Sequence, residues 1–188
     1  ERMLLSARTI WFYLSKLAWP EELVFIYPRW QIDASSPVQW LPVGAWIALL
    51  FAAGAVRART RAPLAALLFF AGSLLPVLGY FNVYPFRYSF VADHFQYLPS
   101  LAIFALAAGA LERLLAAGPR VRWSSSLGCA ALLLVLASKT SRQAGAYHDA
   151  ETLYRATIAA NPACWMAYNN LGRELLRDSH HQEEALAM

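Results

Sequence analysis

The sequence predicts an all-α protein in which polytopic membrane helices precede a helical region of soluble type. Hydrophobic residues make up 59% of the 188 residues and charged residues only 15%, whereas about 25% of an ordinary soluble domain is charged. Four apolar runs follow one another, and after residue 140 they give way to apolar residues at helical spacing. The arginines gather in short gaps between these runs, which explains the net charge of +4 by membrane topology. We therefore expect a lipid bilayer, and no nucleic acid, around this chain.

Residues 1–37 are predicted to form an interfacial helix and a loop on the outer side of the membrane. The first half is apolar apart from a polar stripe, in which Arg2, Thr9 and Lys16 recur every seven residues and so share one helical face. Each central cation costs a spanning helix about 2.5–3.5 kcal/mol, which favours a helix that lies in the interface. Pro20 is expected to end this helix.

A four-helix transmembrane region is predicted over residues 38–140. Its apolar runs approach the roughly 20 residues that a span needs, and they cover residues 41–56, 62–81, 98–117 and 123–138. Pro76 is expected to kink the second helix. The loops 57–61 and 118–122 carry arginines and lie two spans apart, so the positive-inside rule places both in the cytoplasm. The outer loop 82–98 and the region after residue 140 are then expected on the periplasmic side of a multi-pass plasma (inner) membrane.

The region 141–188 has the apolar spacing of two amphipathic helices broken at Asn161-Pro162. This spacing resembles the start of a tetratricopeptide repeat, whose packing positions are matched by Ala150, Tyr154, Pro162, Tyr168, Leu171 and Gly172. One and a half repeats cannot bury a core and about three are needed, so we expect further repeats beyond Met188. The predicted fold class is thus polytopic membrane helices followed by the start of a tetratricopeptide-repeat solenoid.

Between two apolar runs, residues 84–100 interleave charged and aromatic side chains. We select Arg87, Asp93, His94 and Tyr97 from this stretch as candidates for binding a lipid phosphate or another substrate. Arginine can bond a phosphate bidentately, histidine can move a proton near neutral pH, and Asp93 and Tyr97 are about one helical turn apart. A plainer interpretation stays open: polar and aromatic residues gather at any membrane interface, and Asp93 could cap the following helix.

The sequence shows no active site of the soluble-enzyme type. Metal-ligand spacing, a glycine-rich phosphate loop and a nucleophile elbow are all absent, so we expect no metal, see no cofactor and assign no catalytic residue.

Residues 92–100 read Ala-Asp-His-Phe-Gln-Tyr-Leu-Pro-Ser and open an apolar helix that precedes the repeat-like region. Together these features resemble the bacterial relatives of the transmembrane-and-tetratricopeptide-repeat O-mannosyltransferases, whose related motif reads roughly Ala-Asp-Arg-Tyr-x-Tyr-Leu-Pro-Ser. His94 stands in place of the arginine of that motif. The resemblance implies a GT-C-type glycosyltransferase that moves a sugar from a polyprenyl-phosphate carrier to a protein on the outer face of the membrane.

The resemblance also implies that the catalytic carboxylate lies upstream of this chain, which would be a later-span fragment, and that the repeats hold the acceptor protein or an envelope partner. The main alternative is a non-catalytic membrane-anchored scaffold whose repeats assemble envelope proteins. A transporter is disfavoured because the runs 41–56 and 62–81 contain no ionisable residue.

Overall fold

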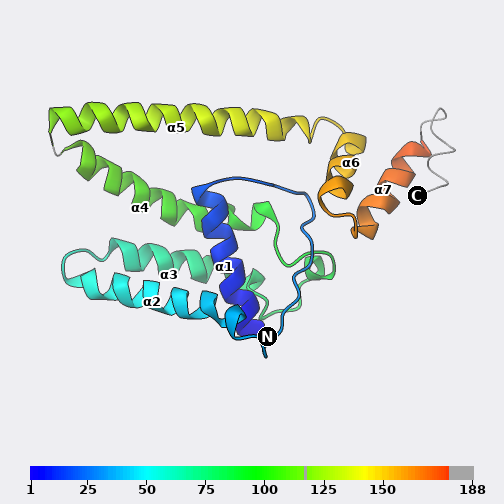
Figure 1. Cartoon of the computed structure of the whole chain (residues 1–188), viewed down its shortest axis with the longest axis horizontal. Coiled ribbons are helices and arrows are strands. Elements are labelled where there is room, and N and C mark those ends of the chain that lie inside the picture. The colour runs from blue at the N-terminus through cyan, green and yellow to red at the C-terminus, as the bar shows by residue number, and fades with distance from the viewer. Residues whose placement is uncertain (117, 178–188) are drawn as a thin grey trace.

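The computed structural model describes residues 1–116 and 118–177, and every regular element within these ranges is helical (Figure 1). The predicted all-α class is confirmed for this part of the chain. The helices are α1 (Arg2–Ala18), α2 (Leu41–Ala55), α3 (Ala62–Leu74), α4 (Tyr97–Leu115), α5 (Pro119–Gly145), α6 (Ala150–Ala160) and α7 (Trp165–Leu175). Short 3₁₀ turns lie at η1 (Pro37–Trp40), η2 (Val56–Ala58), η3 (Leu75–Val77), η4 (Tyr84–Arg87) and η5 (Asp93–Gln96).

Three helical stretches in the described ranges are long and apolar enough to cross a membrane: Pro37–Ala58, Asp93–Leu115 and Val121–Gly145. They expose large apolar side chains such as Phe51, which is 76% exposed, and Leu134, which is 72% exposed. Water would penalise such surfaces, whereas lipid tails accept them. The exposed apolar helices therefore indicate a bilayer environment.

The second predicted span is shorter than expected. The apolar helix runs over Ala62–Val77 and does not reach residue 81. At 1.5 Å per residue it is about 24 Å long, less than the roughly 30 Å of a hydrocarbon core. The α-helix ends at Leu74 and a 3₁₀ turn carries Pro76, because proline has no N–H for the helical ladder. Pro76 thus ends this α-helix, and the predicted kink is wrong.

The fourth predicted span is longer than expected. We placed its end at residue 138, before Lys139, but α5 continues to Gly145. The charge of Lys139 is accommodated because its Nζ lies 3.2 Å from the Glu21 carboxylate and 4.7 Å from the centre of the Trp19 ring. A cation with such partners need not end a helix at the membrane surface. The helical region of soluble type accordingly begins after residue 145.

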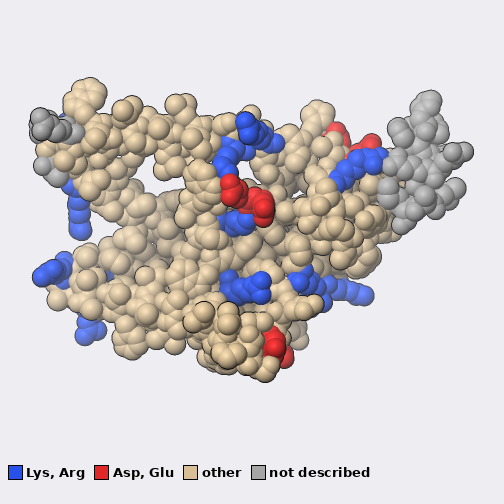
Figure 2. Space-filling model, in the orientation of Figure 1, with Lys and Arg blue, Asp and Glu red and all other residues tan. Residues whose placement is uncertain are grey.

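Figure 1 shows α2 to α5 running roughly along one direction, with α1 crossing them near one end. The α2–α3 and α4–α5 connections both lie at the opposite end, whereas α6 and α7 lie beyond α1. Figure 2 shows basic side chains at both connections. This arrangement agrees with a topology in which the loops 57–61 and 118–122 share one side of the membrane.

The core lies where α1 crosses the other elements. Its buried residues come from α1, the aromatic segment 19–36, α3 and the chain between α3 and α4: Ile10, Tyr13, Tyr27, Phe70, Leu74, Leu78 and Val91. Thr9, which we expected on a polar stripe with Arg2, is fully buried instead, because α1 is covered on that face. The predicted helix is confirmed, but its polar stripe is interrupted.

The segment 19–36 also joins the membrane helices to the α6–α7 pair. The Asn161 amide donates to the Ile26 carbonyl at 3.1 Å, and Phe25 meets Tyr154 edge-on with ring centres 6.5 Å apart. Ile26, Cys164 and Ala167 form a second small core. The two helices broken at Asn161 are as predicted, and the expected continuation over residues 178–188 lies outside the described ranges.

The turn after α3 is pressed against α1 at Gly79. Gly79 has a φ of +90°, and an added Cβ would come within 2.5 Å of Leu5 Cδ2. We predict that Gly79→Ala lowers the free energy of unfolding by about 1–2 kcal/mol, because L-residues resist this backbone conformation. The measurement is a denaturant titration of the purified protein in detergent.

Gly72→Ala is the matched control for that experiment. Gly72 is exposed within α3, and a methyl group added there would meet open space, so alanine should be neutral or stabilise by up to about 1 kcal/mol. Equal losses for both variants would contradict a specific constraint at Gly79.

Candidate functional site

The structure separates the four candidate residues into two pockets. Asp93, His94 and Tyr97 line a pocket of about 430 Å³ at the start of α4. Arg87 lines a different pocket of about 540 Å³ beside the first turn of α1. The two pockets have no lining residue in common. A single site that uses all four side chains is therefore not what this fold builds.

Asp93 is held by a hydrogen bond from a distant part of the chain. The Tyr27 hydroxyl donates to Asp93 Oδ1 at 2.7 Å. Neither η5 nor α4 has a side-chain hydrogen bond at its N-terminus, so the carboxylate does not act as the helix cap that we considered. The Asp93 side chain is instead oriented by a phenol that lies 66 residues earlier.

A second phenol fixes the backbone beside Asp93. The Tyr13 hydroxyl donates to the Ala92 carbonyl and accepts from the Ala92 N–H, both at 3.1 Å. Burial raises the pKa of Tyr13 and that of Tyr27, whose pKa the hydrogen bond to Asp93 raises further. Both phenols therefore stay protonated across the physiological range and remain hydrogen-bond donors.

The rest of this pocket, which we call the Asp93 pocket, is assembled from α1, the segment 19–36, η5, the start of α4 and the end of α5. Its other lining residues are Lys16, Pro20, Leu23, Val24, Phe25, Gln96, Gln143 and Tyr147. The Lys16 ammonium donates to the carbonyls of Glu21 and Glu22. The Gln143 amide donates to the Leu23 carbonyl at 3.0 Å. The pocket thus combines a carboxylate, a cation and aromatic rings at the end of the membrane helices.

His94 and Tyr97 lie at the open side of the Asp93 pocket. Tyr97 is 71% exposed, and the His94 ring meets Phe95 edge-on at 4.5 Å between ring centres. Gln96 Oε1 is buried and accepts no hydrogen bond from the described residues.

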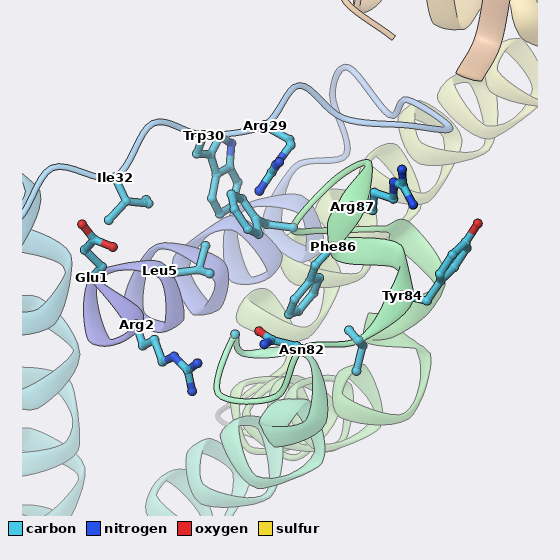
Figure 3. Close-up of a pocket in the computed structure, with 13 residues that line it drawn as sticks. Glu1, Arg2, Leu5, Arg29, Trp30, Ile32, Asn82, Tyr84, Phe86 and Arg87 are labelled. Atoms are coloured by element: carbon cyan, nitrogen blue, oxygen red, sulfur yellow. The ribbon is translucent and has the colours of Figure 1, made fainter. Parts of the chain in front are cut away.

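Arg87 lies with two arginines that sequence reasoning did not select. Arg2 from α1, Arg29 from the segment 19–36 and Arg87 from η4 line one cavity, which we call the arginine pocket (Figure 3). Sequence spacing gives no sign of this association, because the three residues belong to three separate elements. The only available hint was the motif Tyr-Pro-Arg-Trp at residues 27–30, where an arginine stands among aromatic residues as Arg87 does.

The predicted packing positions of the repeat fall on α6, α7 and the turn between them. Leu171 and Gly172 are buried, Ala150, Tyr154 and Tyr168 are half-buried, and Pro162 is exposed in the turn. Among the described residues, no three of the types His, Cys, Asp and Glu gather as metal ligands would.

The described residues form a helical membrane protein with two pockets at one end of its helices, each lined by charged and aromatic side chains. No family model matches the chain, and no solved structure gives a significant match. The chain is 31% identical over 109 residues to Protein O-mannosyl-transferase Tmtc2 of Drosophila melanogaster. The match covers 58% of this chain and 11% of that relative, so the chain spans about a tenth of the relative's length. This similarity supports a distant relationship to the O-mannosyltransferase family that residues 92–100 resemble.

We predict that Tyr27→Phe destabilises the protein by about 1.5–3 kcal/mol, the usual contribution of a hydrogen bond to a charged group. The variant leaves the ring in place but removes the donor to Asp93. Denaturant titration in detergent measures the loss. Tyr84→Phe serves as the control, because the Tyr84 hydroxyl is exposed and bonds only the Tyr88 hydroxyl within the described residues. A loss for Tyr27→Phe no larger than for the control would contradict the role of this bond.

Proposed function

We propose that this chain is part of an integral membrane glycosyltransferase that transfers a sugar from a polyprenyl-phosphate carrier to a protein on the outer face of a bacterial inner membrane. The observation that carries the proposal is the 31% identity over 109 residues with a protein O-mannosyl-transferase. The apolar helices support it, because a lipid-linked donor has to be reached from within the bilayer.

The Asp93 pocket is the part of the chain that we assign to the donor. Its carboxylate can accept hydrogen bonds from sugar hydroxyls, and the exposed Tyr97 ring can pack against a sugar face. Lys16 and His94 supply basic groups for the phosphate. Asp93 is a binding and orienting residue here, since the resemblance to the family places the catalytic carboxylate upstream.

The α6–α7 pair is the part that we assign to the acceptor protein. A pocket of about 540 Å³ on this pair is lined by Pro162, Trp165, Tyr168, Asn169, Gly172, Arg173 and Leu176. Trp165 is 57% exposed, and exposed tryptophan is typical of protein-binding surfaces. The segment 19–36 would hold an acceptor bound here close to the Asp93 pocket, because it contacts both.

Transfer of radiolabelled sugar from polyprenyl phosphate to protein tests the proposal, with the whole protein in membranes. Asp93→Asn should lower the transfer rate about tenfold or more, where each tenfold corresponds to about 1.4 kcal/mol of transition-state stabilisation. Glu112→Gln is the matched control, because it removes a carboxylate from the other end of α4, where Glu112 is exposed. An unchanged rate for Asp93→Asn at equal expression would contradict the assignment.

The exposed aromatic surface of α7 also supports a second function, that of a non-catalytic scaffold for envelope proteins. The two functions give different results in the same membranes. A scaffold would give two results. The wild-type protein would transfer no sugar from any polyprenyl-phosphate donor, and the Trp165→Ala variant would lose envelope partners that the wild-type protein retains in a pull-down.

A further inference from the structure

A further pocket lies directly beside the Asp93 pocket, between the chain that follows α1 and the end of α5. We call it the α5 pocket, and its volume is about 550 Å³. Its lining residues are Pro20, Glu21, Glu22, Leu23, Lys139, Thr140, Arg142, Gln143, Ala144 and Tyr147. Four of these residues also line the Asp93 pocket: Pro20, Leu23, Gln143 and Tyr147. The two pockets therefore share one wall.

This wall is built by residues 20–23, which we call the strap, and by α5. The Gln143 amide donates to the Leu23 carbonyl at 3.0 Å, and this bond joins the strap to α5 between the two pockets. We propose that the strap is a gate, whose opening joins the Asp93 pocket and the α5 pocket into one groove.

Side chains hold the strap, because no backbone–backbone hydrogen bond starts or ends in it within the described residues. The Lys139 ammonium donates to the Pro20 carbonyl at 3.4 Å and lies 3.2 Å from the Glu21 carboxylate. The Lys16 ammonium donates to the carbonyls of Glu21 and Glu22. Figure 2 shows acidic and basic side chains meeting between the end of α1 and α5. Lysine has a flexible stem, so these bonds can open without a movement of either helix.

The strap is exposed in its middle and anchored on both sides. Glu21 and Glu22 are exposed, whereas Tyr13 of α1 before the strap and Ile26 and Tyr27 after it are buried. Segments with few buried contacts and exposed hydrogen bonds open at the lowest cost in free energy. The strap can therefore move while the core and the contact with the α6–α7 pair stay in place.

The closed strap carries backbone strain at Glu22. Its φ is +49°, and among the described residues it is the only residue other than glycine with a positive φ. A side chain makes this conformation unfavourable, so the polar bonds to the strap have to offset its cost. Opening relieves the strain, which brings the open and closed states closer in free energy.

Lys16 couples the gate to the contents of the Asp93 pocket. It lines that pocket, and its ammonium lies 5.7 Å from the centre of the Tyr27 ring, whose hydroxyl bonds Asp93. The same ammonium donates to two carbonyls of the strap. A ligand group that recruits this ammonium draws it away from the strap, so a ligand in the Asp93 pocket favours the open gate.

The gate requires no sugar and no transfer step. Its use in catalysis rests on the proposed function, in which an open strap gives the pocket for the donor a side entrance next to α5. Movement of the strap and transfer of sugar are therefore measured separately.

Distances between two spin labels report the movement of the strap. The labels are placed at Glu22→Cys and Ser141→Cys, which are exposed, in whole protein with Cys129 and Cys164 replaced by alanine. We expect a main distance and a minor, longer one. The control pair is Ser15→Cys with Ser141→Cys, which spans α1 and α5 without the strap and should show one distance.

Two variants should shift the strap towards the longer distance. Lys16→Met should raise the ratio of open to closed strap about tenfold, because it removes the charged donor to two carbonyls. Gln143→Leu should act in the same direction, because it removes the bond within the wall.

Arg8→Met is the matched control, since Arg8 is an exposed cation of α1 that stacks on Trp30 and not on the strap. A single distance that neither Lys16→Met nor Gln143→Leu changes would overturn the gate. An equal change in the Ser15 control pair would also overturn it, because α1 and not the strap would then move.

A reversible lock tests the gate against transfer. Glu21→Cys combined with Lys139→Cys places two thiols where the carboxylate and the ammonium now meet, and a short cleavable crosslinker joins them. The locked protein should transfer radiolabelled sugar from polyprenyl phosphate at least about tenfold more slowly, and cleavage should restore the rate. Each single-cysteine variant with the same crosslinker is the control.

The two failures are distinguishable. Locked protein that transfers sugar at the unlocked rate would overturn the gate as the entrance to the Asp93 pocket. Wild-type protein that transfers no sugar, with a strap that still shows both spin-label distances, would contradict the proposed function and support the gate.

Discussion

Two buried phenols fix the turn that carries Asp93, and the packing at this end of the membrane helices depends on them. Tyr13 holds both polar groups of the Ala92 backbone, and Tyr27 bonds the adjacent carboxylate. Their rings belong to the same core cluster as Phe70 of α3. Because each buried phenol needs a hydrogen-bond partner, these bonds favour the observed packing of α1, the segment 19–36 and the start of α4.

The segment 19–36 has no regular helix, yet it contacts several separate elements of the fold. Its residues meet α5 through Glu21 and Leu23, η5 through Tyr27, and the α6–α7 pair through Ile26. Each contact is a hydrogen bond or ion pair between residues far apart in the sequence. Ordering the segment costs conformational entropy, and the burial of the apolar side chains of Ile26 and Tyr27 offsets this cost. The segment thereby links the membrane helices, the Asp93 pocket and the α6–α7 pair.

Periodicity and composition predicted the all-α class, α1, three of the spanning stretches and the α6–α7 break, because each of these depends on local apolar spacing. They did not predict where α3 and α5 end. Pro76 ends α3 through local backbone geometry, and α5 continues past Lys139 because the charge of this residue is paired with the distant Glu21. Asp93 and Arg87 belong to one stretch of sequence but line different pockets, because neighbours in sequence need not share a pocket. Arg2, Arg29 and Tyr27 were missed because only the tertiary fold brings them to these sites.

Both pockets should lie on one side of the membrane and the arginine-rich connections on the other, and the proposed function depends on this topology. Single cysteines test it directly, in whole protein with Cys129 and Cys164 replaced by alanine, using a membrane-impermeant thiol reagent on intact cells. We predict that Tyr84→Cys is labelled from outside and that Arg59→Cys is labelled only after permeabilisation. Labelling of both from the same side, or the reverse pattern, would contradict this topology.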